Sequence, residues 1–184
     1  MSSERLIRSG TGANLGGASA HNRRVIIEAL RLNGALSRAD LARSTHLTPQ
    51  TVSNIVAELC NMGLVSADAP VRSGRGQPAV PHRLVANGAF ALGLHIDRHY
   101  LRVVATNLVG EPLVREGVVL PGREPDEGIG ALLDLLKSAR RQLAAVAPES
   151  EERLVGLGIA MPGPFGIVRG RDDPWMMAKW QSYP

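Results

Sequence analysis

The sequence predicts an α/β protein in two parts: a helical N-terminal half that ends in a two-stranded ribbon, and a C-terminal half that combines strands with a long helix. Three observations support this prediction. Three segments before residue 63 have apolar residues at helical spacing, strand-like stretches follow from residue 89, and positive charge is concentrated in the first half. The chain has 184 residues, of which 44% are apolar, enough for two small domains with aliphatic cores.

Residues 1–20 are rich in Ser and Gly and lack the apolar segment of an export signal, which predicts a disordered arm. The first helix is predicted within "NRRVIIEALRLNG", where four apolar residues share one face and Asn33-Gly34 ends the pattern. A short second helix is predicted after Ser37, because Asp40 follows three residues later and the two side chains form a capping box.

A third helix is predicted from Thr48 as N-cap and Pro49 as first residue to Gly63, which can adopt the left-handed C-terminal conformation. One face of this helix is apolar and the opposite face is uncharged. The predicted apolar face holds Val52, Ile55, Val56, Leu59 and Met62, and the opposite face holds Gln50, Thr51, Asn54, Ala57 and Asn61.

The stretch "LVSADAPVRSGRGQPAVPHRLV" has an apolar pair at each end and a tip rich in Gly, Pro and Arg, so it predicts a ribbon directly after the third helix. Three helices followed by such a ribbon are the arrangement of a winged helix-turn-helix, here predicted over residues 21–87. At the ribbon tip, Arg72 and Arg75 are expected to contact DNA phosphates or the minor groove. An ordinary solvated loop is the alternative for both arginines.

The start of the third helix predicts a DNA-reading surface. In this fold the N-terminal residues of the third helix enter the major groove, where Gln50 and Asn54 can pair with adenine and Thr51 can offer its hydroxyl or methyl group. Thr48 and the helix N-terminus are placed for a backbone phosphate. Two alternatives remain: Thr-Pro-Gln can serve as capping chemistry alone, and some winged helices bind proteins instead of DNA.

The charge distribution agrees with a polyanionic partner. Residues 1–87 contain ten Arg and five acidic residues, a net charge of +5, whereas the remainder contains eleven bases and twelve acids, a net charge of −1. Excess positive charge confined to the N-terminal half is expected if that half meets double-stranded operator DNA. Cys60 is the only cysteine, so no disulfide can form within the chain and a cytoplasmic location is expected. The longest apolar run, residues 154–168, is broken by Gly and Pro and predicts no membrane span.

The second half, residues 88–184, predicts three successive strands, a helix and a fourth strand. The strands are expected at residues 89–96, 100–107 and 112–120, and the fourth, Leu154 to Ala160, is expected to be fully buried. The helix opens at Pro125 or Asp126, ends before Pro148, and is expected to bury Ile129, Leu132, Leu133, Leu136 and Leu143. This order is how a ribonuclease-H-like or actin-like lobe begins.

Several of these segments together resemble one family. The helix-turn-helix, "SGRGQPAVPHRLVANG", "FALGLHIDRHYLRVVATNLVGEPL" and "GLGIAMPGPFG" are similar in register to ROK-family transcriptional regulators from about His21 to Phe165. The resemblance implies a winged helix followed by part of a sugar-kinase-like ROK domain, and full-length relatives that respond to sugars as repressors or activators and usually form homo-oligomers. It also makes Gly163 and Pro164 candidates for the edge of a sugar site.

The chain departs from the kinase members of the family. Their first hairpin carries an Asp-Ile-Gly-Gly-Thr phosphate loop, for which this chain has the run from His95 to His99 and no glycine, so ATP binding is not expected. The chain stops at Pro184, before the catalytic and zinc-binding motifs of the family, which suggests a truncated ROK domain. We therefore expect no catalytic residue, cofactor or metal; a sugar kinase and a metal site at His95, Asp97 and His99 are the alternatives.

Overall fold

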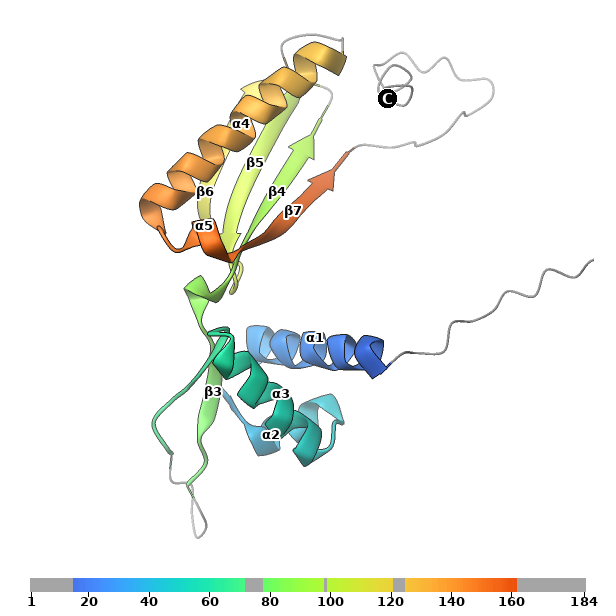
Figure 1. Ribbon diagram of the computed structural model, residues 1–184, viewed down its shortest axis with the longest axis vertical. Helices are drawn as coiled ribbons and strands as arrows, with labels where there is room; N and C mark the ends of the chain where they lie inside the picture. The colour runs from blue at the N-terminus through green and yellow to red at the C-terminus, as the bar shows by residue number, and fades with distance from the viewer. Residues whose placement is uncertain (1–14, 72–77, 98, 121–124, 162–184) are drawn as a thin grey trace, which may run out of the picture. The chain divides into compact units, whose positions relative to one another are not determined.

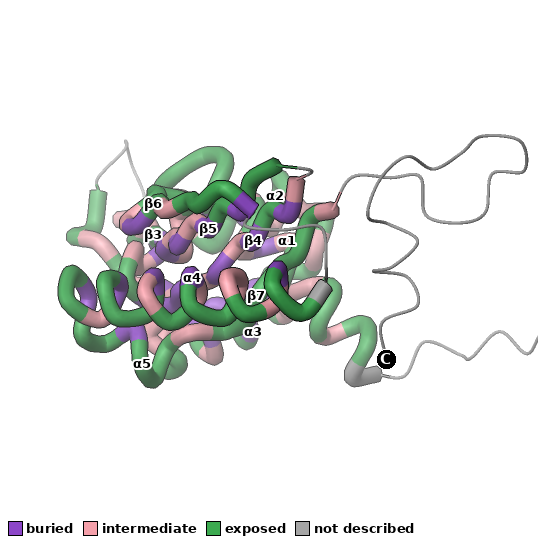
Figure 2. The backbone as a smooth tube through the Cα atoms, turned by 90° about the horizontal axis from the view of Figure 1, so that it is seen from above, coloured by how far each residue is buried: buried purple, intermediate pink, exposed green. Residues whose placement is uncertain are grey.

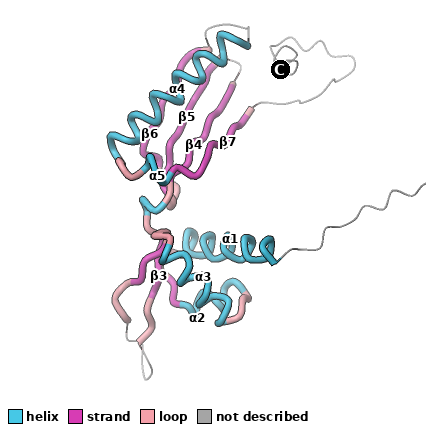
Figure 3. The backbone as a smooth tube through the Cα atoms, viewed as in Figure 1, coloured by secondary structure: helices cyan, strands magenta, loops and turns pink. Residues whose placement is uncertain are grey.

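The computed structural model describes residues 15–71, 78–97, 99–120 and 125–161, and these form two compact units that divide between Leu84 and Val85. Figure 3 shows that the first unit is mainly helical and that the second is built around a sheet. The prediction of an α/β chain with a winged helix-turn-helix and a following sheet domain is confirmed.

The first unit contains three helices and a small antiparallel sheet (Figure 1). The helices are α1 (Leu15–Asn33), α2 (Arg38–Thr45) and α3 (Pro49–Asn61); the strands are β1 (Leu36–Ser37), β2 (Val65–Ala67) and β3 (Pro81–Leu84), in the order β1-β3-β2. Strands β2 and β3 are the base of the predicted ribbon, and an isolated bridge pairs Val71 with Ala79 farther along it. Strand β1 was not predicted; it adds a third strand by pairing with the β3 residues His82 and Pro81.

The core of this unit is aliphatic and is formed by one face of each helix. It comprises Ile26, Leu30, Leu41, Val52, Ile55, Val56, Leu59, Val65 and Leu84. Two sequence expectations are corrected here. Residues 15–20, expected in the disordered arm, form the first turns of α1, since Ala18 and Ala20 are strong helix formers. Met62, expected in the apolar stripe, is exposed because α3 ends at Asn61 and the chain then turns at Gly63, whose φ is 70°.

The second unit is a four-stranded sheet with a long helix on one face (Figure 1). Strands β4 (Phe90–Ile96), β5 (Tyr100–Asn107) and β6 (Pro112–Val119) form an antiparallel meander, and β7 (Leu154–Ala160) pairs parallel with β4 at the sheet edge. A 3-10 turn, η1 (Ala86–Gly88), leads into β4. Helices α4 (Pro125–Val146) and α5 (Ser150–Arg153) connect β6 to β7, and α5 was not predicted because one helical turn leaves no periodic pattern.

Helix α4 packs over β5 and β6, and its buried side faces the sheet (Figure 2). Two further corrections follow from this placement. Leu133 is 48% exposed, whereas the core is filled by Leu135, Ala139 and Leu143, because Leu133 falls outside the helical face that meets the sheet. Strand β7 was expected to be fully buried, yet only Leu154 packs partly against the core, and three other large apolar residues of the strand are exposed, since α4 does not extend over this edge. Those residues are Val155, Leu157 and Ile159.

Candidate nucleic-acid interface

Helices α2 and α3 are joined by a tight turn that the local sequence specifies. His46 ends α2 in the left-handed conformation, with φ of 56°, and Thr48 begins α3 two residues later. At the other end of α2, the backbone N–H of Asp40 donates to the Ser37 hydroxyl at 3.2 Å, and the Asp40 carboxylate accepts from Ser37 in return. The Ser37 hydrogen bond, with help from Arg43, lowers the pKa of Asp40. The predicted capping box is therefore present, and it fixes where α2 starts relative to α3.

The N-terminus of α3 is held by threonine side chains. The Thr51 backbone N–H donates to the Thr48 hydroxyl oxygen at 3.2 Å, and the two hydroxyls lie 2.9 Å apart. Pro49 occupies the first turn, where it has no N–H to satisfy. The remaining N–H groups of this turn and its partial positive charge are available to an anion, as at other exposed helix N-termini.

Gln50 and Asn54 form one exposed polar unit on α3. The Gln50 Nε2 group donates to the Asn54 Oδ1 atom at 2.9 Å, and both residues are exposed. If both amides were assigned the other way round, the hydrogen bond would reverse, but the pair would still present one free carbonyl and one free NH₂ group. An acceptor beside a donor is the complement of the N6 and N7 edge of adenine in the major groove. The opposite face of α3 is buried, so this pair is held on a rigid support.

The arginines around this surface divide into paired and unpaired groups. Arg23 pairs with Glu58 at 2.5 Å, Arg83 pairs with Asp68 at 2.5 Å, and Arg43 pairs with Asp40. Within the described ranges, Arg24 and Arg38 make no ion pair. Arg38 is exposed and is the first residue of α2, so its charge lies at a helix N-terminus. Arg38 was not among the site residues predicted from the sequence. A base directly after an N-cap serine does not stabilise the helix, and this could have marked Arg38 as a candidate for a binding role.

Beside Arg38 lies a groove with a buried histidine. The groove has a volume of about 580 Å³ and lies where the N-terminus of α2 meets the base of the ribbon. His82 on β3 is 4% exposed, and its Nδ1 atom has no hydrogen-bond partner among the residues that the structure describes. Burial and the nearby charge of Arg38 lower the pKa of His82, which keeps the imidazole neutral. The groove is lined by Ser37, Arg38, Ala39, Ala67, Pro78, Ala79, Val80 and His82.

The predicted site residues fall into two groups. Thr48, Gln50, Thr51 and Asn54 lie together within the first two turns of α3, as the spacing predicted. The other predicted site residues, Arg72, Arg75, Gly163 and Pro164, lie outside the described residues.

The alternative metal site lies at the β4–β5 hairpin, of which Arg98 is outside the described residues. Strands β4 and β5 are joined by a tight hairpin in which the Asp97 N–H donates to the Tyr100 carbonyl at 2.8 Å. The turn interrupts the alternation that would place His95, Asp97 and His99 on one face. Among the residues that the structure describes, no group of three His, Cys, Asp or Glu side chains is placed to hold a metal ion. No described helix is long and apolar enough to cross a membrane.

Comparison with known proteins gives matches to both units. Residues 20–66 match the family described as winged helix-turn-helix DNA-binding. A transcriptional regulator of Mycobacterium tuberculosis is 31% identical over 161 residues, covering 86% of this chain and 35% of that protein. A putative xylose repressor of a Caldicellulosiruptor species is 26% identical over 167 residues, covering 89% of this chain and 40% of that protein.

A solved structure shares the fold. The crystal structure of a ROK family transcriptional regulator, a homolog of the E. coli MLC protein, superposes with a TM-score of 0.62 at 24% identity. The superposition covers 79% of this chain and 36% of that one. This chain therefore spans between about a third and two fifths of the length of the relatives it matches. Both units have counterparts there: the chain has a winged helix-turn-helix of the DNA-binding class followed by a sheet unit with the fold found in ROK family transcriptional regulators.

Proposed function

We propose that this chain is a sequence-specific transcriptional regulator that binds operator DNA through α3. The observation that carries the proposal is the exposed amide pair of Gln50 and Asn54, 2.9 Å apart on a helix whose opposite face is buried. A solvated helix face has no need of two bonded amides, whereas a major-groove reader needs donors and acceptors at fixed positions. The names of the relatives, which include transcriptional regulators and xylose repressors, support the same proposal.

We assign the positioning of the protein on the DNA duplex to contacts with backbone phosphates. The N-terminus of α3 with Thr48, the unpaired Arg38 at the start of α2, and the ribbon arginines Arg72 and Arg75 supply them. Such contacts carry little sequence information, but they make affinity fall steeply with salt. Arg75→Ala should therefore weaken binding to all sequences alike and should reduce the slope of log affinity against log salt by about one.

The test is a selection from fragmented genomic DNA with the purified chain, followed by affinity measurements on the enriched sequence at several salt concentrations. The proposal requires an enriched motif and a steep salt dependence. A winged helix that binds protein instead would give no enriched motif and negligible affinity for duplex DNA.

We propose, from the names of the relatives, that the regulator responds to a small molecule. Several relatives are named xylose repressors, so a sugar is the proposed effector class, with Gly163 and Pro164 at the edge of its site. Release of the selected DNA fragment by a pentose or hexose would support this. We also propose that the regulator acts as a homo-oligomer in the cytoplasm; a selected motif with two inverted half-sites would agree with a two-fold dimer.

We propose that the chain is not an enzyme. Several relatives carry regulator or repressor names, and the β4–β5 hairpin has no glycine between His95 and His99. ATP-dependent phosphorylation of any hexose by the purified chain would support the alternative, a sugar kinase. Assays with radiolabelled ATP and a panel of hexoses decide between the two.

A further inference from the structure

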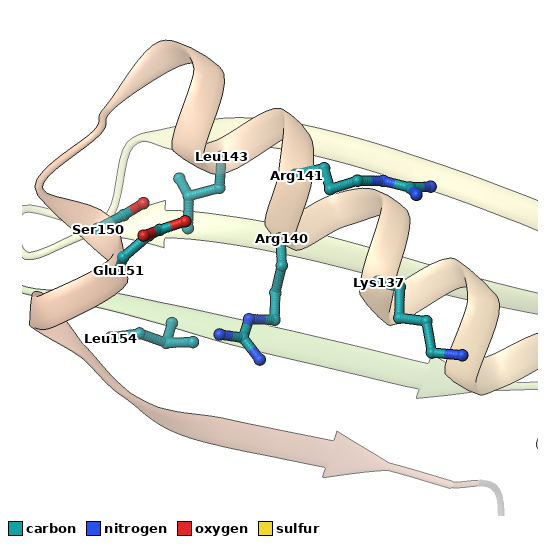
Figure 4. Close-up of a pocket in the computed structure, with 7 residues that line it drawn as sticks. All are labelled: Lys137, Arg140, Arg141, Leu143, Ser150, Glu151 and Leu154. Atoms are coloured by element: carbon teal, nitrogen blue, oxygen red, sulfur yellow. The ribbon is translucent and has the colours of Figure 1, made fainter.

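A cavity of about 330 Å³ opens beside the C-terminal half of α4 in the second unit (Figure 4). It forms where α5 and the start of β7 pass alongside α4 at the sheet edge. Its volume is at the lower end of the range typical of small-molecule sites. The cavity is lined by Lys137, Arg140, Arg141, Leu143, Ser150, Glu151 and Leu154.

Positive charge is concentrated at this cavity. Three of its seven lining residues are cations and one, Glu151, is an anion. Residues 88–184 as a whole contain eleven bases and twelve acids, so the second half of the chain is slightly acidic. Three cations around one opening are therefore a local feature and do not follow from the average charge of the unit.

These cations retain their capacity to bind an anion. Arg140 and Arg141 make no ion pair within the described part of the chain. Lys137 lies 3.4 Å from the Asp134 carboxylate, and both side chains are mostly exposed, so this pair contributes little. Glu149, next to the lining residue Ser150, does not line the cavity and accepts a hydrogen bond from Asn87 at 2.8 Å.

The side chains differ in how they can contact a ligand (Figure 4). Arg140 extends from α4 toward β7 and Leu154, and Lys137 extends from the preceding turn. Arg141 points in another direction along the helix, so it adds positive potential more than direct contact. Ser150 is 3% exposed and brings a hydroxyl to the opposite side of the opening. Leu143, which is 1% exposed, forms an apolar wall that excludes water from one side.

We infer that this cavity binds a compact anion that carries phosphate groups. The Arg140 guanidinium offers two parallel donors to phosphate oxygens, Lys137 offers a compact charge, and the Ser150 hydroxyl offers a further donor. Glu151 disfavours a ligand that is negative along its whole length, and its carboxylate can accept from a hydroxyl on the organic part of a phosphate ester. Duplex DNA needs a track of cations instead of one cavity in an acidic unit. The inference does not depend on the proposed DNA binding by α3.

The experiment uses inorganic pyrophosphate as the probe, titrated into the purified full chain by calorimetry at physiological salt. We expect saturable binding at one site per chain. Arg140→Gln should weaken this binding by about tenfold or more, because a charge-assisted hydrogen-bond pair is lost, and Lys137→Gln should weaken it as well. The matched control is Arg115→Gln, which removes an exposed arginine of β6 that does not line the cavity and should leave the affinity unchanged.

Circular dichroism of each variant shows whether the fold is retained; both arginines are exposed, so neither replacement should alter it. Absence of saturable binding to the wild-type chain would overturn the inference, as would equal weakening by Arg115→Gln and Arg140→Gln. Competition by a short duplex for the pyrophosphate site would also overturn it and would instead make this cavity a second contact with nucleic acid. Failure of this experiment leaves the role of α3 untouched, because the Gln50 and Asn54 surface is tested by sequence selection.

Discussion

Replacing Asn54 by alanine should change which DNA sequence is preferred while leaving the protein folded. Asn54 is exposed, and among the described residues its side chain bonds only to Gln50, which is also exposed, so truncation should alter the free energy of unfolding by no more than about 0.5 kcal/mol. Loss of a bidentate contact with a base costs about 1–3 kcal/mol, equivalent to about 5-fold to 150-fold in affinity. The loss should be confined to one or two base pairs of the motif and absent when those pairs are already mismatched.

The hydrogen bond between the two amides predicts that their effects are coupled. Gln50→Ala removes the group that orients Asn54, so each single replacement should already lose part of the other's contribution. The double replacement should therefore cost less than the sum of the two singles, by about 0.5–3 kcal/mol. Fluorescence anisotropy with the selected duplex and with each single-base variant measures all four proteins of the cycle.

The matched control is Asn61→Ala, which removes the same side chain from the other end of α3, where it is also exposed. This variant should keep both affinity and sequence preference. The reasoning is refuted if Asn54→Ala leaves the preference unchanged, if it weakens all sequences equally, or if the double replacement is strictly additive. A large fall in melting temperature for Asn54→Ala would show instead that the residue supports the fold.

Three further outcomes test the first unit. Leu41→Ala should destabilise it by about 2–5 kcal/mol in chemical denaturation, since Leu41 is 0% exposed, whereas Leu32→Ala, at 66% exposed, should have little effect. Gly63→Ala should cost about 1–2 kcal/mol because the residue has φ of 70°, whereas Gly17→Ala inside α1 should be stabilising, and equal effects would contradict the backbone argument. Burial lowers the pKa of His82, so the unfolded chain binds a proton at this residue more readily than the folded chain does. The free energy of unfolding should therefore fall as the pH drops below the ordinary histidine range. His82→Leu should reduce that fall in thermal melts measured between neutral and mildly acidic pH.

Local sequence signals predicted the helix-turn-helix closely because the start of α2 and both ends of α3 have chemical markers. The markers either bond to free backbone N–H groups or allow a backbone conformation that ends the helix, and all of them have this role in the structure. They are Ser37 with Asp40, Thr48 with Pro49, and Gly63. The cluster at the N-terminus of α3 followed from those boundaries. Its internal hydrogen bonds could not be predicted, because they depend on side-chain rotamers and not on spacing alone.

The expectations that were wrong for the second unit concern packing between elements. The apolar run in β7 has the composition of a buried strand, but exposure depends on how far α4 extends over the sheet, and periodicity carries no such information. Leu133 has the residue type of a core position, yet the face of α4 is set by its contacts with β5 and β6. The position of Arg38 beside His82 could not be predicted for a similar reason, since it comes from the pairing of β1 with β3.

The exposed apolar residues of β7 have a practical consequence for handling the protein. Strand β7 is at the edge of its sheet, so among the described residues its outer backbone groups have no neighbouring strand, and Val155 and Ile159 remain accessible beside them. Such an edge recruits strands from other molecules, and the tendency grows with concentration. Concentrated stocks should therefore show slow turbidity in storage, and Ile159→Lys should delay its onset in light-scattering measurements.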